Sequence, residues 1–168
     1  SLAGNRKGLT GERSSIFFKF IRILNELAIE KRLPQAVLIE NVTGLLNSGN
    51  GKDIREVIFS LNQLGYSCDV LVINAVYFVP QSRPRVFIIG LKTSESKRAT
   101  QTLKDNHSVY FQHPCRPLAV QKVIVANPDL SWNFLELSPL PTRKTILADL
   151  VETNDHQKWF NDTELIRE

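Results

Sequence analysis

The chain has 168 residues, of which 42% are hydrophobic and 23% are charged, a composition that predicts a folded core and excludes wholesale disorder. No apolar run approaches the roughly 20 residues that a membrane-spanning helix needs. The net charge is +4, and residues 1–98 hold 14 Lys and Arg against 8 Asp and Glu, so the basic first part suits an anionic partner such as nucleic acid.

The first elements predicted along the chain are a loop and a helix. Residues 1–13 hold three glycines among polar residues and predict a loop. Apolar residues then recur at helical spacing, which predicts a helix that begins at Ser14 or Ser15 and ends near Lys31. The apolar positions of this helix are Phe17, Phe20, Ile21, Leu24, Leu27 and Ala28.

A strand and a second helix follow. Residues 36–39 form a continuous apolar run, which predicts a central parallel strand, buried on both faces, that ends at Glu40 and Asn41. A loop over 43–51 leads to a helix over 54–64, and Gly65 stands where a C-terminal cap belongs.

Residues 67–75 and 85–91 predict two further strands. The nine residues that separate them, 76–84, are too few for a helical crossover, so the pair should be antiparallel. Together these elements predict an α/β sheet with a reversed strand near one edge.

The chain changes character after residue 92. It becomes polar and then rich in Pro, with one strand predicted over 118–126 and a helical turn or two over 145–151. We expect this part to be a linker and the start of another domain.

The cysteines and histidines indicate a cytoplasmic protein without a metal centre. Cys68 and Cys115 form no CxxC pair and no evident disulfide framework. His107 and His113 lie near Cys115 in the sequence, but their spacing matches no standard zinc site. The chain also contains no Met, even at its start, and we therefore expect an internal piece of a longer protein.

Glu40 is the first candidate site residue. Ligands of open α/β sheets bind beyond the carboxyl ends of the strands, and an acid placed there after four apolar residues should be partly desolvated. Desolvation favours the protonated form of a carboxyl group, which suits a proton donor. The alternatives are that Glu40 caps the next loop or pairs with a nearby Arg.

Arginines supply the other candidates. Arg83 and Arg85 lie in a segment stiffened by Pro80 and Pro84, and two guanidinium groups on one side of an extended segment can bracket a phosphate or a carboxylate. A solvated turn with two surface arginines explains them equally well. The opening loop, with Arg6 and its neighbours, could close over an anionic ligand or be an ordinary charged loop.

Three segments, taken together and in this order, resemble the DNA (cytosine-5)-methyltransferases of bacterial restriction–modification type. Residues 1–18 are similar to the family's mobile catalytic loop and the start of its next helix. Glu40-Asn41-Val42 is the family's ENV motif. Residues 74–90 are similar to the PQxRxR motif, here Pro80-Gln81-Ser82-Arg83-Pro84-Arg85, with its flanking strands. One tripeptide carries little weight, but three motifs at this spacing are specific.

The resemblance implies the fold class and the domain division. Residues 1–92 would form part of the catalytic domain, the C-terminal half of a Rossmann-like S-adenosylmethionine-dependent methyltransferase sheet with an antiparallel strand pair. Residues 93–168 would be a linker and the beginning of an irregular target-recognition region. The implied partners are double-stranded DNA and the missing N- and C-terminal parts of the same enzyme, without membrane or metal, in the bacterial cytoplasm or on the nucleoid.

The resemblance also implies residue roles. In this family a cysteine thiolate adds to C6 of a cytosine flipped out of the duplex, and C5 then takes methyl from S-adenosylmethionine. By motif position Glu40 would protonate N3, Arg85 would contact O2, and Arg83 would brace the loop or a phosphate. The remaining roles are DNA contacts by Ser1, Arg6, Lys7, Arg13 and Gln81, an adenine contact by Ile16, and a structural role for Asn41 in the turn.

The family's nucleophile is the main departure. Its Pro-Cys motif would lie a few residues before Ser1, and the glycine-rich cofactor motif is also missing, so we expect residues 1–168 to be inactive alone. Two alternatives stay open: a subunit of a split methyltransferase whose partner supplies the cysteine, and a non-catalytic DNA-binding relative that uses the same basic surface.

Overall fold

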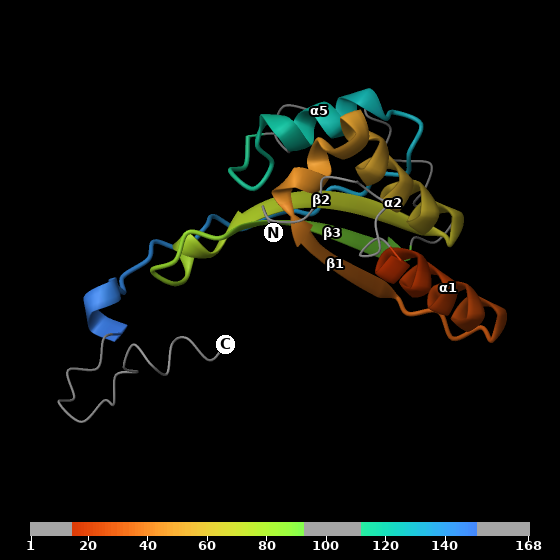
Figure 1. Cartoon of the computed structure of the whole chain (residues 1–168), viewed down its shortest axis with the longest axis horizontal. Helices are drawn as coiled ribbons and strands as arrows, with labels where there is room; N and C mark the ends of the chain where they lie inside the picture. The colour runs from red at the N-terminus through yellow and green to blue at the C-terminus, as the bar shows by residue number, and fades with distance from the viewer. Residues whose placement is uncertain (1–14, 93–111, 151–168) are drawn as a thin grey trace, which may run out of the picture.

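A computed structural model of the chain describes residues 15–92 and 112–150. These ranges form an α/β structure in which three α-helices pack against a three-stranded sheet (Figure 1). The elements in chain order are α1 (Ser15–Ile29), β1 (Ala36–Val42), α2 (Lys52–Gln63), β2 (Tyr66–Asn74), β3 (Pro84–Lys92) and α5 (Leu118–Ala126). Short 3-10 turns are η3 (Thr43–Leu46), η4 (Ser48–Gly51), η5 (Ala75–Tyr77) and η6 (Leu147–Leu150).

The two helices predicted in the first half are confirmed. The apolar face of α1 packs on the core through the buried Leu24, and α2 buries residues at helical spacing, among them Ile54 and Leu61. Gly65 follows α2 with a φ of 90°, a left-handed conformation that glycine adopts without a steric penalty. Both helices therefore follow from sequence periodicity.

The sheet has the order β1-β3-β2, and β3 is antiparallel to both of its neighbours. The predicted antiparallel pair, β2 and β3, is confirmed. The prediction for residues 36–39 is wrong in three respects. The reversed strand β3 separates β1 from β2, so β1 has an antiparallel neighbour and is an edge among the described strands. Leu38 is 63% exposed, so one face is not buried. The strand also continues through Glu40 and Asn41 to Val42.

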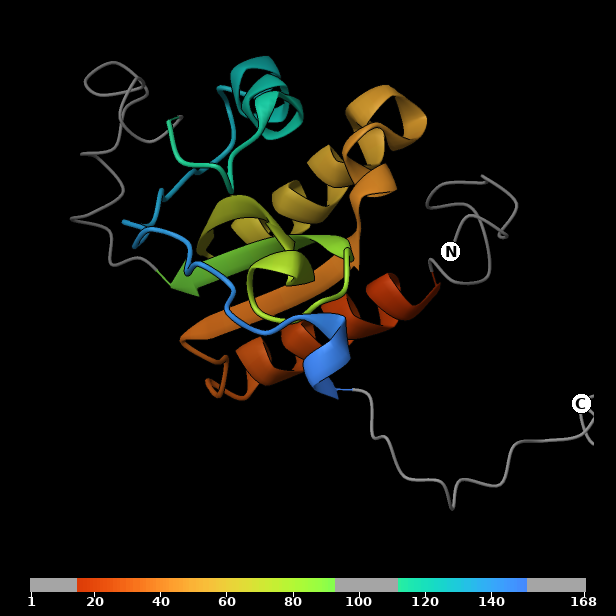
Figure 2. The same cartoon turned by 90° about the vertical axis from the view of Figure 1, so that its left-hand side faces the viewer.

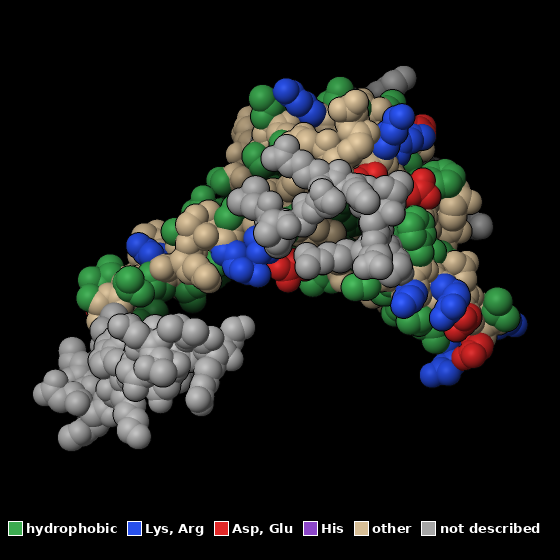
Figure 3. Space-filling model, viewed as in Figure 1, with side chains coloured by type: hydrophobic (Ala, Val, Ile, Leu, Met, Phe, Trp, Pro, Cys, Tyr) green, Lys and Arg blue, Asp and Glu red, His purple; other side chains and the backbone are tan. Residues whose placement is uncertain are grey.

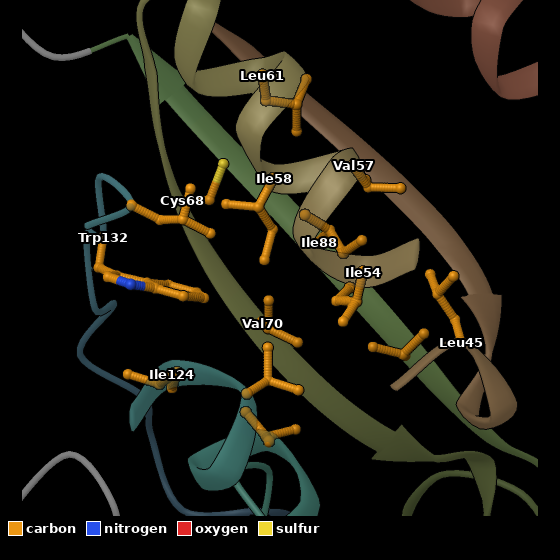
Figure 4. Packing of buried hydrophobic residues seen from close by; sticks show 14 of the residues in the cluster. Leu45, Ile54, Val57, Ile58, Leu61, Cys68, Val70, Ile88, Ile124 and Trp132 are labelled. Carbon is orange, nitrogen blue, oxygen red and sulfur yellow. The ribbon is translucent and has the colours of Figure 1, made fainter. Parts of the chain in front are cut away.

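The strand register divides the sheet into two faces. Side chains paired across antiparallel strands share a face, which places Val37, Ile88 and Val70 on the face that forms the hydrophobic core with all three α-helices. Figure 4 shows α2 residues directed at this face. Leu38, Glu40 and Arg85 lie on the opposite face, which we call the second face.

The segment 118–126 is the helix α5, so the strand predicted there is wrong. Its buried residues, Val120, Val123 and Ile124, follow the i, i+3, i+4 pattern of a helix packed on one side. The β-branched composition favoured a strand, but burial against β2 and η3 selects the helix. The helical turn predicted over 145–151 is found as the single turn η6.

The hydrophobic core extends beyond residue 92. Trp132 is buried in it beside Ile124 (Figure 4). The backbone of Cys68 in β2 accepts a hydrogen bond from Asn133 and donates one to Ser131, so this segment continues the sheet beyond β2. The hydrophobic core therefore includes residues from both sides of residue 92. The division into a catalytic part, 1–92, and a linker with the start of a target-recognition region, 93–168, remains a prediction about function.

The chain leaves the core after Leu135. Residues 136–150 run beside the loop that joins β2 to β3 and end at η6, as both views show (Figures 1 and 2). Figure 3 shows hydrophobic side chains gathered over η6, where Ile146, Leu147 and Leu150 are more than half exposed. Among the described helices, none combines the length and the apolar character needed to cross a bilayer.

Candidate functional site

Glu40 and Arg85 meet on the second face of the sheet. Glu40 pairs in register with Phe87, and Arg85 pairs with Val42, so the two side chains are diagonal neighbours on adjacent strands. Arg85 Nε lies 3.4 Å from Glu40 Oε1. The ENV and PQxRxR motifs are thereby brought together at the end of the sheet where β1 and β2 finish and β3 begins.

Glu40 is more exposed than its sequence position indicated. Its side chain is 55% exposed and that of Arg85 is 22% exposed, so the predicted desolvation of Glu40 is wrong for this structure. The reason is that β1 lies at the edge of the described part of the sheet and Glu40 points to the second face. An exposed ion pair adds only about 0–1 kcal/mol to stability, so the pairing does not by itself account for these two residues.

A short loop, residues 75–83, carries the remaining motif side chains. Gln81 and Arg83 are exposed, and the exposed Phe78 and Val79 lie just before them. Arg85 Nη1 donates a hydrogen bond of 2.9 Å to the Pro84 carbonyl, which directs the guanidinium back along the strand. The loop thus offers cationic, polar and apolar groups to solvent beside the Glu40–Arg85 pair.

Asn74 anchors this loop and was missed by sequence reasoning. Its Oδ1 accepts hydrogen bonds from the backbone N–H groups of Val76 and Arg83, at 3.1 and 2.8 Å. Its Nδ2 donates to Ser82 Oγ at 3.3 Å. An Asn at the end of a strand, directly before a turn, is a recognised turn former, and that signal could have identified it.

The other candidate residues are less informative in the structure. Ile16, at the start of α1, is 67% exposed. Asn41 is exposed, and its Oδ1 accepts a hydrogen bond of 2.8 Å from the Val42 N–H. Ser1, Arg6, Lys7 and Arg13 lie outside the described residues. Within 15–92 and 112–150, no three His, Cys, Asp or Glu side chains gather as metal ligands would.

Both cysteines of the chain are buried free thiols. Cys68 lies in β2 with no exposed surface, and burial raises the pKa of its thiol to about 12. Burial also raises the pKa of the Cys115 thiol. A nucleophile must form a thiolate and reach its substrate, so neither thiol is suited to that task.

We expect both thiols to resist Ellman's reagent in the folded chain at pH 8, and to react quickly once urea unfolds it. The pKa of Cys68 is raised in the folded state from an ordinary value of 9.0, so the unfolded chain loses this proton first as the pH rises. The Cys68 contribution to stability should therefore be lost as the pH rises from about 9 to about 12. Fast labelling of either thiol before unfolding would contradict the assignment.

Glu40, Arg83 and Arg85 gather at the edge of the sheet where β1 and β2 end and β3 begins, and ligands of open α/β sheets bind beyond the carboxyl ends of the strands. The chain belongs to the C-5 cytosine-specific DNA methylase family, whose model matches residues 1–167. The resemblance inferred from the three motifs is thereby confirmed.

Individual relatives agree with the family. The orphan methyltransferase M.SPRI of Bacillus phage SPR is 34% identical over 161 residues, which cover 95% of this chain and 34% of the relative. The type II methyltransferase M.BanI of Aneurinibacillus aneurinilyticus is 36% identical over 98 residues, 58% of this chain and 22% of the relative. The orphan methyltransferase M.SPBetaI of Bacillus phage SPbeta is 42% identical over 82 residues, 48% and 17% of the two chains. The chain thus spans about a third or less of these relatives' length.

Proposed function

We propose that this chain is the middle portion of a DNA cytosine-5 methyltransferase of restriction–modification type. The complete enzyme transfers methyl from S-adenosylmethionine to C5 of a cytosine flipped out of a specific duplex site. The observation that carries the proposal is the meeting of Glu40 and Arg85, from two separate family motifs, at the same end of the sheet.

The two side chains have complementary tasks on a flipped cytosine. Glu40 holds the N3 and exocyclic amino edge: as a carboxylic acid it donates to N3, and its other oxygen accepts from the amino group. Thymine offers N3–H and a carbonyl on the same edge, so Glu40 selects cytosine. Arg85 donates to O2 and stabilises the negative charge that develops on the ring.

The adjoining loop of residues 75–83 faces the DNA. Arg83 and Gln81 are exposed there and reach phosphate or sugar oxygens, which positions the duplex without reading its sequence. Ser1, Arg6, Lys7 and Arg13 add further phosphate contacts from the opening loop and help to offset the few kcal/mol that base flipping requires.

The cofactor lies near the start of α1 in this proposal. S-adenosylmethionine, when bound, supplies the electrophilic methyl group. Ile16 fits a contact with its adenine, because this apolar side chain is 67% exposed at the N-terminal end of α1, where it could shield one face of a ring from water. Asn41 keeps its structural role through its hydrogen bond to the Val42 N–H.

The thiolate nucleophile comes from outside residues 1–168. The burial of both Cys68 and Cys115 supports this. Residues 136–150, which run beyond the sheet, belong to the linker and the beginning of the target-recognition region, which we assign to 93–168. The catalytic part is assigned to residues 1–92.

Methyl transfer tests the proposal directly. The complete enzyme, incubated with duplex DNA and S-adenosylmethionine labelled in its methyl group, should give label that digestion recovers as 5-methylcytosine. Residues 1–168 alone should transfer none, because the nucleophile is absent. Label on adenine, label on the amino group of cytosine, or turnover by residues 1–168 alone would contradict the proposal.

A further inference from the structure

We propose that Asn74 is a positioning residue for methylation: its carboxamide fixes the loop of residues 75–83 so that Arg83 and Arg85 are presented to DNA in one preset arrangement. This inference rests on the function proposed above. It concerns a residue whose side-chain hydrogen bonds go to the loop itself, so that it acts through the conformation of the loop.

The carboxamide bridges the two ends of the loop. Asn74 is the last residue of β2, and its Oδ1 accepts from the N–H of Val76 at one end and of Arg83 at the other. Its Nδ2 donates to Ser82 Oγ. One side chain thus ties the departing strand, the first turn and the returning chain together.

Hydrogen bonds hold this loop, whose residues lie outside the hydrophobic core cluster. Phe78 is 56% exposed and Val79 is 44% exposed. The backbone contributes a bond of 3.3 Å from the Ala75 N–H to the Arg83 carbonyl, and the Phe78 and Val79 N–H groups both bond to the Ala75 carbonyl. Where apolar packing is this slight, the loss of the Asn74 bonds should loosen the loop without unfolding the sheet.

A loosened loop would lower activity through geometry. The backbone N–H of Arg83 donates a hydrogen bond directly to Asn74 Oδ1, and Arg85 follows two residues later at the start of β3. Preset geometry lowers the entropy lost on binding, and displacement of a contact by about 1 Å can cost about 100-fold in rate. Asn74 is therefore expected to affect catalysis although it lies outside the contacts with substrate.

Two substitutions of Asn74 in the complete enzyme distinguish a positioning role in catalysis from a purely structural role. Asn74→Leu keeps the size of the side chain but removes all three hydrogen bonds, and should lower kcat/KM for duplex DNA by about tenfold or more. Asn74→Asp still accepts from both N–H groups, and the Ser82 hydroxyl can donate to its second oxygen, so activity should return to within about threefold of wild type. Ser82→Ala, the matched control, removes only one partner and should behave like Asn74→Asp.

Amide hydrogen exchange on residues 1–168 gives a second readout. The Val76 and Arg83 amides should exchange faster in Asn74→Leu, while those of β3 keep their protection. Activity within about twofold of wild type for Asn74→Leu, or equal loss in Asn74→Leu and Asn74→Asp, would overturn the inference. Failure of both Asn74→Leu and Asn74→Ala to fold would also overturn it. If the wild-type complete enzyme transfers no methyl to C5 of cytosine, the proposed function fails instead.

Discussion

Replacement of Glu40 by Gln in the complete enzyme is expected to lower the rate of methyl transfer by about 10²- to 10⁴-fold, the usual worth of a general acid. Gln keeps the shape of the side chain and can still hydrogen-bond to the base, but its amide protons are far too weakly acidic to be transferred to N3. Radiolabel transfer to duplex DNA under single-turnover conditions measures the loss without interference from product release.

The chain offers a matched control for this substitution. Glu26 is also an exposed carboxylate in an ion pair with an Arg, since Arg22 Nε lies 3.6 Å from Glu26 Oε1 on α1. Glu26→Gln should leave methylation unchanged, and neither variant should alter the thermal unfolding midpoint appreciably, because exposed pairs contribute little to stability. Methylation by Glu40→Gln at the wild-type rate would remove Glu40 from the mechanism.

Sequence patterns correctly predicted those helices and strands whose structure depends on residues nearby in the sequence. The apolar spacing around Leu24 and Ile54 identified α1 and α2, and the short 76–84 segment identified the antiparallel pair of β2 and β3. The meeting of Glu40 with Arg85 followed from the order of family motifs, and no periodicity would have revealed it. Their pairing depends on a long-range strand register that no single segment encodes.

The predictions that failed depended on tertiary neighbours. Leu38 belongs to an apolar run that fits a central strand equally well, but β3 lies between β1 and β2, and no described strand pairs with the other side of β1. Val120 and Val123 have β-branched side chains typical of strands, yet packing on β2 selects a helix. Asp69 in the middle of β2 gave no signal of its own, because its partner Arg116 is distant in the sequence and joins it only in the folded state.

Replacement of Asp69 by Ala is expected to cause a large loss of stability, about 3–5 kcal/mol, because it removes the carboxylate that is paired with a buried guanidinium. Both side chains are only 1% exposed. Arg116 Nη2 lies 2.5 Å from Asp69 Oδ2, and the same nitrogen donates to the Leu135 carbonyl at 2.9 Å. Asp69 also accepts from the backbone N–H of Leu135.

Urea unfolding of residues 1–168 measures this loss, with Asp129→Ala as the control. Asp129 also pairs with an arginine, Arg55, but at the surface, so its replacement should change the free energy of unfolding only slightly. A double variant, Asp69→Leu with Arg116→Met, removes both charges and should recover much of the loss, because apolar replacements of a buried pair are often neutral. A loss below about 1 kcal/mol for Asp69→Ala would show that water reaches the Arg116 charge.

The Asp69–Arg116 pair also attaches the segment around Cys115 to the sheet. Its loss should therefore loosen this segment as well as lower the overall stability. Cys115 immediately precedes Arg116, and its carbonyl accepts a hydrogen bond of 2.7 Å from the Val72 N–H of β2. In Asp69→Ala the segment around Cys115 should open before the sheet unfolds, and this thiol should then react with Ellman's reagent while Cys68 stays protected. If both thiols react together, Asp69 and Arg116 instead stabilise the whole core as one cooperative unit.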